Sequence, residues 1–263
     1  MSSSKNLVKV TWPVPRVALA QPTQVTINSP SNRNALSQHL IREICSTLED
    51  LDRKETTAAV ILAGSDSPHV CFSAGFDVTE LASLPSVQVT QSLKLLVSTL
   101  EQGISAPLIA AVGGIAVGGG CELALACEII YTTTDARFAL PEVQLGVMAA
   151  GGGIRRLPDA VGAGRAAELL LTGRAWSGSD TVAWGMAAKS FETWDECLQS
   201  AINCAKTIVE NSPEAVRVTK KLFRSARKTS PPELLSIELQ EFQNLLDSQE
   251  HIRRRTAWLN RKK

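Results

Sequence analysis

The sequence lacks the features that mark several common classes of protein. Its six cysteines form no C-x-x-C pair and no cluster with histidine at metal-ligand spacing, so we expect reduced thiols and no metal site. No stretch approaches the ~18 consecutive apolar residues of a membrane-spanning helix. Residues 1–12, MSSSKNLVKVTW, show neither a signal peptide nor an Arg-rich presequence. These absences predict a cytoplasmic protein without membrane association, with a mitochondrial or peroxisomal location left open.

Charge of neither sign is in excess. The 263 residues carry 27 Lys and Arg against 26 Asp and Glu, a net charge of +1, which gives the molecule as a whole no attraction to nucleic acids or anionic membranes. No P-loop motif and no G-x-S-x-G motif is present. GAGRAA at 162–167 fits a dinucleotide fingerprint, but it follows a charged segment interrupted by Pro158 rather than a strand. This context disfavours a nucleotide-dependent oxidoreductase.

Short β-branched runs alternate with helical patterns through the first half of the chain. Strands are expected at residues 7–12, 17–21, 24–29, 58–64, 107–112 and 128–133. A helix capped by Asn34 or Ser37 is expected over 36–51, and another over 86–102. This alternation predicts an α/β fold with a parallel sheet. From about residue 160 the pattern is almost wholly helical, which predicts a helical appendage.

Three consecutive glycines, Gly118–Gly120, separate the strand expected at 107–112 from a helical run that contains Glu122. Backbone N–H groups at a helix start have no intrahelical partner, and without Cβ atoms a ligand oxygen can approach them closely. Glu122 would repel a phosphate, so a developing oxyanion with a carboxylate nearby for proton transfer fits these residues better. The alternative is a tight packing turn with Glu122 as a solvated first-turn acid.

Two further segments supply residues for the same chemistry. CFSAGFDVTEL (71–81) offers the backbone N–H of Ala74 as a second oxyanion donor; otherwise it is an ordinary loop that caps a helix. FALPEVQLGVMAAGGGIRRL (138–157) carries Glu142, which could also be a simple helix-start acid. Two carboxylates in apolar surroundings suit acid–base catalysis, because burial raises a carboxyl pKa toward neutral pH.

Taken together, the motifs resemble the enoyl-CoA hydratase/isomerase (crotonase) superfamily along nearly the whole chain. The resemblance rests on RNAL (33–36), FSAGFD (72–77), AVGGIAVGGGCELALACEI (111–129), ARFALPEVQLGV (136–147), GGGIRRLPDAVG (151–162), AAELLLTGRAWSGSDTVAWGMA (166–187) and TAWLNRKK (256–263). It implies a spiral of ββα turns over residues 1–190. It also implies a C-terminal helical region, 191–263, that forms homotrimers, which commonly pair into hexamers.

The resemblance also implies roles for individual residues. Backbone N–H groups of Ala74 and Gly119 would hold the thioester oxygen of an acyl-CoA, while Glu122 would activate water and Glu142 would protonate the α-carbon of an enoyl-CoA. Having both glutamates favours a hydratase; a double-bond isomerase or another acyl-CoA lyase is the alternative, and an RNA-binding protein of the same fold a distant one. The implied substrate-binding positions are Arg33, Ala35, Ser73, Gly75, Phe76, Asp77 and Gly118. No metal or cofactor is implied beyond the coenzyme A of the substrate.

The chain also departs from the family pattern. Ala149 and Ala150 stand where many hydratases have Pro-Gly, and Gly113 stands where Asn is common. The added methyl groups would narrow the acyl pocket, although the backbone N–H of Ala150 could still contact the water. The length and branching of the acyl chain are therefore left open.

Two side-chain patterns follow residue 190. Arg217, Lys220, Lys221, Arg224, Arg227 and Lys228 form a basic stripe on roughly one side of a helix. It could be a solvated face, a contact for CoA phosphates across a subunit interface, or an RNA-binding surface. Apolar residues of the same region exceed what a small appendage can bury on itself: Leu222, Phe223, Leu234, Leu235, Leu239, Phe242, Leu245 and Leu246. We expect subunits to share them.

Overall fold

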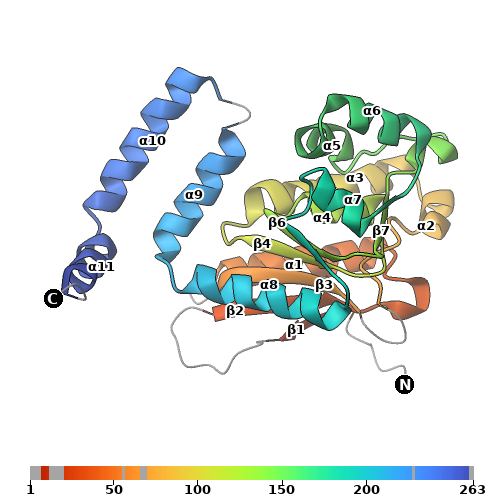
Figure 1. Ribbon diagram of the computed structural model, residues 1–263. Helices are drawn as coiled ribbons and strands as arrows, with labels where there is room; N and C mark the ends of the chain where they lie inside the picture. The colour runs from red at the N-terminus through yellow and green to blue at the C-terminus, as the bar shows by residue number, and fades with distance from the viewer. Residues whose placement is uncertain (1–6, 12–20, 55–56, 66–69, 227–228, 261–263) are drawn as a thin grey trace.

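The computed structural model describes residues 7–11, 21–54, 57–65, 70–226 and 229–260 and arranges them as an α/β fold (Figure 1). Its main sheet has six strands in the order β1-β2-β3-β4-β6-β9. These are β1 (Val8–Thr11), β2 (Gln21–Ile27), β3 (Thr57–Gly64), β4 (Leu108–Val112), β6 (Ile129–Thr133) and β9 (Lys189–Phe191). β1 is antiparallel to β2, and every later neighbouring pair is parallel. The predicted parallel sheet is confirmed.

Strand β2 occupies a region where the sequence predicts two strands. Its continuous run from Gln21 to Ile27 joins the end of one predicted strand to most of the other, and residues 17–20 lie outside the described residues. Pro22 does not break the ladder because it sits at a register shift between β2 and β3, where a missing N–H is tolerated.

Helices cover both faces of the main sheet, whose strands β3 and β4 are buried along their whole length. On one face, α1 (Gln38–Asp52) packs its apolar side against Val60 and Leu62, and the Ser37 side chain caps it as predicted. On the other face, α8 (Trp194–Val209) packs against alternate β3 residues such as Ala59 and Ile61. Helix α8 therefore contributes to the core although it follows residue 190, and the division of the chain into two regions at that residue stays a prediction.

A second, three-stranded sheet was not predicted from the sequence. It contains β5 (Ile115–Val117), β7 (Arg137–Ala139) and β8 (Trp176–Ser177). Strands of two or three residues are too short for a period-two pattern to be recognised, and the same reason explains the missed strand β9. The small sheet has a specific consequence: the loop residue Ser73 pairs with Ala116 of β5, which fixes the 71–77 loop beside the glycine turn.

Further helices and turns connect these sheets. They are η1 (Pro30–Asn32), α2 (Val78–Ser83), α3 (Ser86–Ser98), the π-helical turn η2 (Thr99–Gly103), α4 (Gly119–Leu125), η3 (Glu142–Leu145), α5 (Gly153–Val161), α6 (Ala163–Thr172) and α7 (Gly178–Ala183). The helix predicted over 86–102 is thus an α-helix that ends in one π-helical turn. Within the described residues, no helix has both the length and the apolar character needed to span a membrane.

The C-terminal helices are α9 (Pro213–Ser225), α10 (Pro231–Leu246) and α11 (Gln249–Asn260). Figure 1 shows α10 and α11 standing apart from the sheets, and α10 packs against α9 and α11. Its exposed apolar side chains include Leu235, Leu239 and Phe242. The predicted surplus of apolar surface in this region is therefore present in the single chain.

The basic stripe on α9 is used within the chain, contrary to its interpretation as a solvated face. Lys220 is buried; its Nζ donates to the carbonyl of Ala106 at 2.6 Å and lies 3.2 Å from a carboxylate oxygen of Glu128. Arg224 pairs with the same carboxylate and donates to the Ala126 carbonyl at 2.9 Å. Lys221 pairs with Glu241 at 2.8 Å, and Arg217 donates to the Thr57 carbonyl at 3.4 Å. Arg227 and Lys228 lie outside the described residues.

Candidate active site

The glycines of the 118–120 turn are required by close approach to the 71–77 loop. Gly118 has a φ of +52°, a backbone conformation that side chains disfavour. A Cβ on Gly119 would lie 2.6 Å from the ring of Phe76, and one on Gly120 would lie 2.4 Å from the Ser73 carbonyl oxygen. The turn thus brings the start of α4 directly against the 71–77 loop.

Glu122, in the first turn of α4, is buried rather than solvated. The residue is only 3 % exposed, and the backbone N–H of Gly153 donates to its Oε1 at 2.8 Å. The pKa of Glu122 is about 7, with burial as the largest cause of the rise and the neighbouring Glu142 adding to it. The interpretation as a solvated first-turn acid is therefore wrong, and the carboxyl can gain or lose a proton near neutral pH.

Glu142 begins the short helix η3 on the other side of the glycine turn. Its Oε1 lies 3.1 Å from the position that a Cβ would take on Gly118. Its Oε2 is buried and accepts no hydrogen bond from any described residue, and burial raises the pKa of this carboxyl. Two carboxyl groups with raised pKa values thus flank the glycine turn, which is the juxtaposition the sequence predicts.

The structure corrects the prediction for Ala74. Its backbone N–H donates to the Arg33 carbonyl at 3.0 Å, so it is not free to hold a ligand oxygen. Two residues later, the N–H of Phe76 makes no hydrogen bond to a described residue, and neither does that of Gly119 at the start of α4. Phe76 and Gly119 are in contact. Phe76 and Gly119 therefore offer a pair of open N–H donors in place of Ala74 and Gly119. Sequence reasoning placed Phe76 among the substrate-binding positions but missed its N–H as a donor, because the bond between Ala74 and Arg33 leaves no local signal.

A buried network fixes the loop that carries Phe76. The side chain of Asn34 donates to the carbonyls of Cys71 and Phe72 at 2.8 and 3.2 Å. Ser73 Oγ donates back to the Asn34 carbonyl at 2.8 Å. Arg33 and Asn34 both have positive φ values, 54° and 55°, a strained conformation that persists where surrounding contacts over-determine it. The RNAL segment therefore supports the loop.

Several positions matched to substrate binding have structural partners in the chain. Ser73 is fully buried in the network just described. Asp77 caps α2 by accepting from the N–H of Thr79 at 2.9 Å. Arg33 is exposed, whereas Ala35 is half-buried and Gly75 is buried with a φ of +91°. Together with Phe76 and Gly118, these residues lie on the loops around the glycine turn, and their contact with coenzyme A stays a prediction.

Gly113 and Ala149, both noted as departures from the family pattern, are set by packing. A Cβ on Gly113 would lie 2.3 Å from Val70 Cγ1 and 2.7 Å from the Trp194 ring, so this position has no room for a side chain. Ala149 is buried, and a Cβ added to Gly153 would lie 3.1 Å from the Cβ of Ala149. Ala149 thus packs directly against the residue that hydrogen-bonds Glu122.

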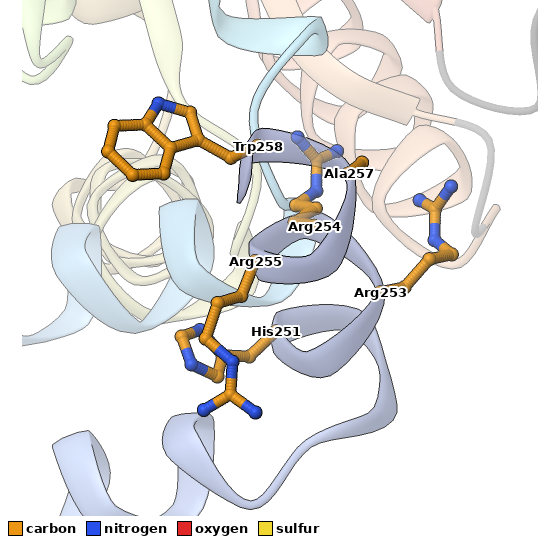
Figure 2. Close-up of a pocket in the computed structure, with 6 residues that line it drawn as sticks. All are labelled: His251, Arg253, Arg254, Arg255, Ala257 and Trp258. Atoms are coloured by element: carbon orange, nitrogen blue, oxygen red, sulfur yellow. The ribbon is translucent and has the colours of Figure 1, made fainter. Parts of the chain in front are cut away.

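A basic hollow of about 560 Å³ lies elsewhere, on α11. Figure 2 shows the residues that line it, His251, Arg253, Arg254, Arg255, Ala257 and Trp258. Arg253 and Arg254 both pair with Glu250, which neutralises part of the positive charge. The hollow shares no residue with the glycine turn or its two glutamates, so it forms no part of the candidate active site.

Known proteins show the same pattern over the same length. Residues 20–263 match the sequence profile of the family described as "Enoyl-CoA hydratase/isomerase". A probable enoyl-CoA hydratase of Rhizobium meliloti is 33% identical over 241 residues, covering 91% of both chains. The mitochondrial enoyl-CoA hydratase of Pongo abelii is 34% identical over 241 residues, covering 91% of this chain and 81% of its own.

Solved structures agree in fold. The crystal structure of an enoyl-CoA hydratase from Bacillus anthracis superposes with a TM-score of 0.88 at 29% identity, covering 97% of this chain and 96% of that one. This match confirms the predicted crotonase-like α/β fold with a helical C-terminal region. The chain belongs to the enoyl-CoA hydratase/isomerase family.

Proposed function

We propose that the protein is an enoyl-CoA hydratase, a lyase that adds water across the α,β double bond of an enoyl-CoA thioester. The observation that carries this proposal is the buried carboxyl group of Glu122 and the half-buried one of Glu142, on either side of the turn that presents the N–H of Gly119. The names of the relatives support the same activity.

In the proposed mechanism, ionised Glu122 removes a proton from water as the water oxygen bonds to the β-carbon. Electrons of the double bond then move toward the thioester carbonyl, whose oxygen gains negative charge as an enolate forms. The N–H groups of Phe76 and Gly119 hydrogen-bond that oxygen and stabilise it more strongly than the neutral carbonyl. Protonated Glu142 delivers its proton to the α-carbon. Proton transfer and charge stabilisation complete the reaction, so the proposal includes no metal or further cofactor.

The test is to assay a panel of enoyl-CoA thioesters that differ in length and branching, with products identified by mass. Glu122→Gln and Glu142→Gln keep the shape of each side chain but abolish proton transfer, so each should lower turnover by roughly 10²-fold or more with little change in KM. Hydration that survives either substitution would contradict the proposal. If Glu122→Gln abolishes the hydratase activity but leaves double-bond migration, the protein is instead an isomerase.

We further propose that the protein works as a homotrimer or as a hexamer of two trimers. This proposal is supported by the exposed apolar surface of α10 and by the membership of the family. No nucleic acid or membrane partner is part of the proposal.

A further inference from the structure

The carboxylate of Glu122 rests on a glycine loop, residues 151–153. The N–H of Gly153 donates to Oε1. A Cβ on Gly151 would lie 2.4 Å from Oε2, and one on Gly153 would lie 3.0 Å from Oε1. The loop backbone thus touches both oxygens of the carboxylate, and the position of the loop determines where Glu122 points.

Arg156, on α5, holds this loop from the other side. Its Nη1 donates to the carbonyl of Gly151 at 2.8 Å. A Cβ on Gly152 would lie 2.2 Å from the same Nη1, so the guanidinium lies directly against the loop backbone. The Arg156 side chain is 11 % exposed. Its charge is therefore largely withdrawn from water and must be balanced within the protein.

Glu101, on the π-helical turn η2, balances that charge. Arg156 Nη2 donates to Glu101 Oε1 at 2.7 Å. The turn itself is fixed by Arg224 of α9, which donates to the carbonyls of Leu100 and Glu101. Arg155 pairs with the same Glu101 oxygen, but its side chain is 48 % exposed and no hydrogen bond joins it to Gly151. Arg155 and Arg156 thus share Glu101 as a counter-ion, but of these two side chains only that of Arg156 hydrogen-bonds the loop.

We propose that Arg156 is a positioning residue for Glu122: its guanidinium, held by Glu101, fixes the Gly151–Gly153 loop that orients the carboxylate. This inference rests on the proposed function in one respect, that Glu122 is the base. Arginine suits the role because its planar fork donates to two acceptors in fixed directions, which a lysine ammonium cannot reproduce.

The charge of Arg156 also bears on the protonation of Glu122. Glu142 and Cys121 are the other titratable groups near that carboxyl, and Arg155, Arg224, Cys127 and Glu101 surround Arg156. The pKa of Glu122 is raised by burial and by Glu142 and lowered by the Gly153 and Gly151 N–H groups and by Arg156. Removing the guanidinium takes away one lowering influence and loosens the loop that supplies the other two. The pKa of Glu122 should therefore rise.

The experiment compares Arg156→Gln, Arg156→Lys and the control Arg155→Gln. With a short enoyl-CoA thioester as substrate, Arg156→Gln should lower kcat about tenfold or more while KM changes less than about twofold, since a misplaced base affects the reaction rather than binding. The acidic limb of its pH–rate profile should move to higher pH. Arg156→Lys should lose less, because it keeps the charge but not the fork. Arg155→Gln should stay within about twofold of wild type.

A second readout does not require activity. Selective ¹³C labelling of glutamate side chains, with the Glu122 signal assigned by its absence in Glu122→Gln, reports the pKa of that carboxyl directly. Arg156→Gln should raise it and Arg155→Gln should not. A wild type that hydrates no thioester would refute the proposed function but leave this titration valid. If Arg156→Gln does not fold, the kcat and the Glu122 titration of Arg156→Lys test the proposal instead. The proposal is overturned if a folded Arg156 variant keeps both wild-type kcat and wild-type Glu122 titration, or if Arg155→Gln causes the same change.

Discussion

At the scale of single residues, Glu122 shows a conflict between stability and chemistry. A carboxylate that is 3 % exposed lacks the hydration that stabilises its charge in the unfolded chain, and the hydrogen bond from Gly153 offsets this cost only in part. The folded protein therefore binds the proton of Glu122 more tightly than the unfolded chain does. Between the unfolded pKa of 4.5 and the folded pKa of about 7, rising pH should lower the free energy of unfolding.

Replacement of Glu122 by Gln should therefore stabilise the fold above pH 7. Gln has no charge to bury, and moving a pKa from 4.5 to about 7 corresponds to about 3 kcal/mol. The gain should be largest above pH 7 and should vanish near pH 4, where the carboxyl is protonated in both states. Urea unfolding of both proteins across this pH range measures it. If the stability difference between the two proteins does not vary with pH, the pKa of Glu122 is not raised in the folded state.

The open backbone donors give a second prediction at this scale. Phe76→Pro removes the Phe76 N–H, so turnover should fall by roughly 10² to 10³, the usual effect of losing one oxyanion donor. Phe76→Ala keeps the N–H and loses the ring that packs on Gly119, and it should retain much more of the turnover. Circular dichroism checks that both variants fold. A folded and fully active Phe76→Pro protein would show that this N–H does not contact the substrate.

Local patterns could predict some of these residues and not others. The glycine turn and both glutamates carry signals in the sequence itself, because only small residues allow the close approach seen at Gly119 and Gly120. The choice between Ala74 and Phe76 depends on which N–H is already bonded, and Arg33, which accepts from Ala74, is about 40 residues away in the sequence. The folded structure, in which the RNAL segment packs on the 71–77 loop, is therefore needed to tell which of the two N–H groups is open.

At the scale of elements, burial on both faces made β3 and β4 predictable as continuous apolar runs. The short strands β5, β7, β8 and β9 gave no such pattern and form because neighbouring segments supply their partners. Helix α9 illustrates the same limit. Its charges predict a surface helix, yet Lys220 and Arg224 bind Glu128, which also accepts from the Leu108 N–H at 2.8 Å. Long-range pairing, absent from any local pattern, determines its position.

The attachment of α9 should therefore depend on Glu128. Glu128→Gln leaves Lys220 buried without its counter-ion, and breaking a buried pair in this way costs about 3–5 kcal/mol. Lys221→Gln is the matched control, because Lys221 is 67 % exposed in its pair with Glu241, and exposed pairs contribute about 1 kcal/mol or less. Urea unfolding measures both variants, and hydrogen exchange should show faster exchange in α9 for Glu128→Gln alone. Equal effects in the two variants would mean that Glu128 does not anchor α9.

At the scale of the whole molecule, α10 carries an apolar stripe that the single chain leaves uncovered. Leu235, Leu239, Phe242 and Leu246 recur at spacings of four, three and four residues, so they share one helical face, and they are 41–60 % exposed. A contiguous exposed apolar surface of this kind marks an interaction site. In Figure 1, α10 and α11 also stand apart from the sheets, and we therefore predict that the stripe is covered by other subunits.

We therefore expect light scattering to give the mass of a trimer or hexamer for the wild type at micromolar concentration. The double variant Leu239→Glu, Phe242→Glu should be monomeric, because charge on the stripe opposes its burial. Gln240→Glu is the control: it adds a charge beside Leu239 but off the stripe, so the assembly should persist. Glu122 is buried within one chain, and Glu142 lies beside the glycine turn of the same chain, so monomers that stay folded should keep the titration of Glu122 even if turnover falls. A wild type that is monomeric, or a double variant that assembles normally, would show that the α10 stripe does not join subunits.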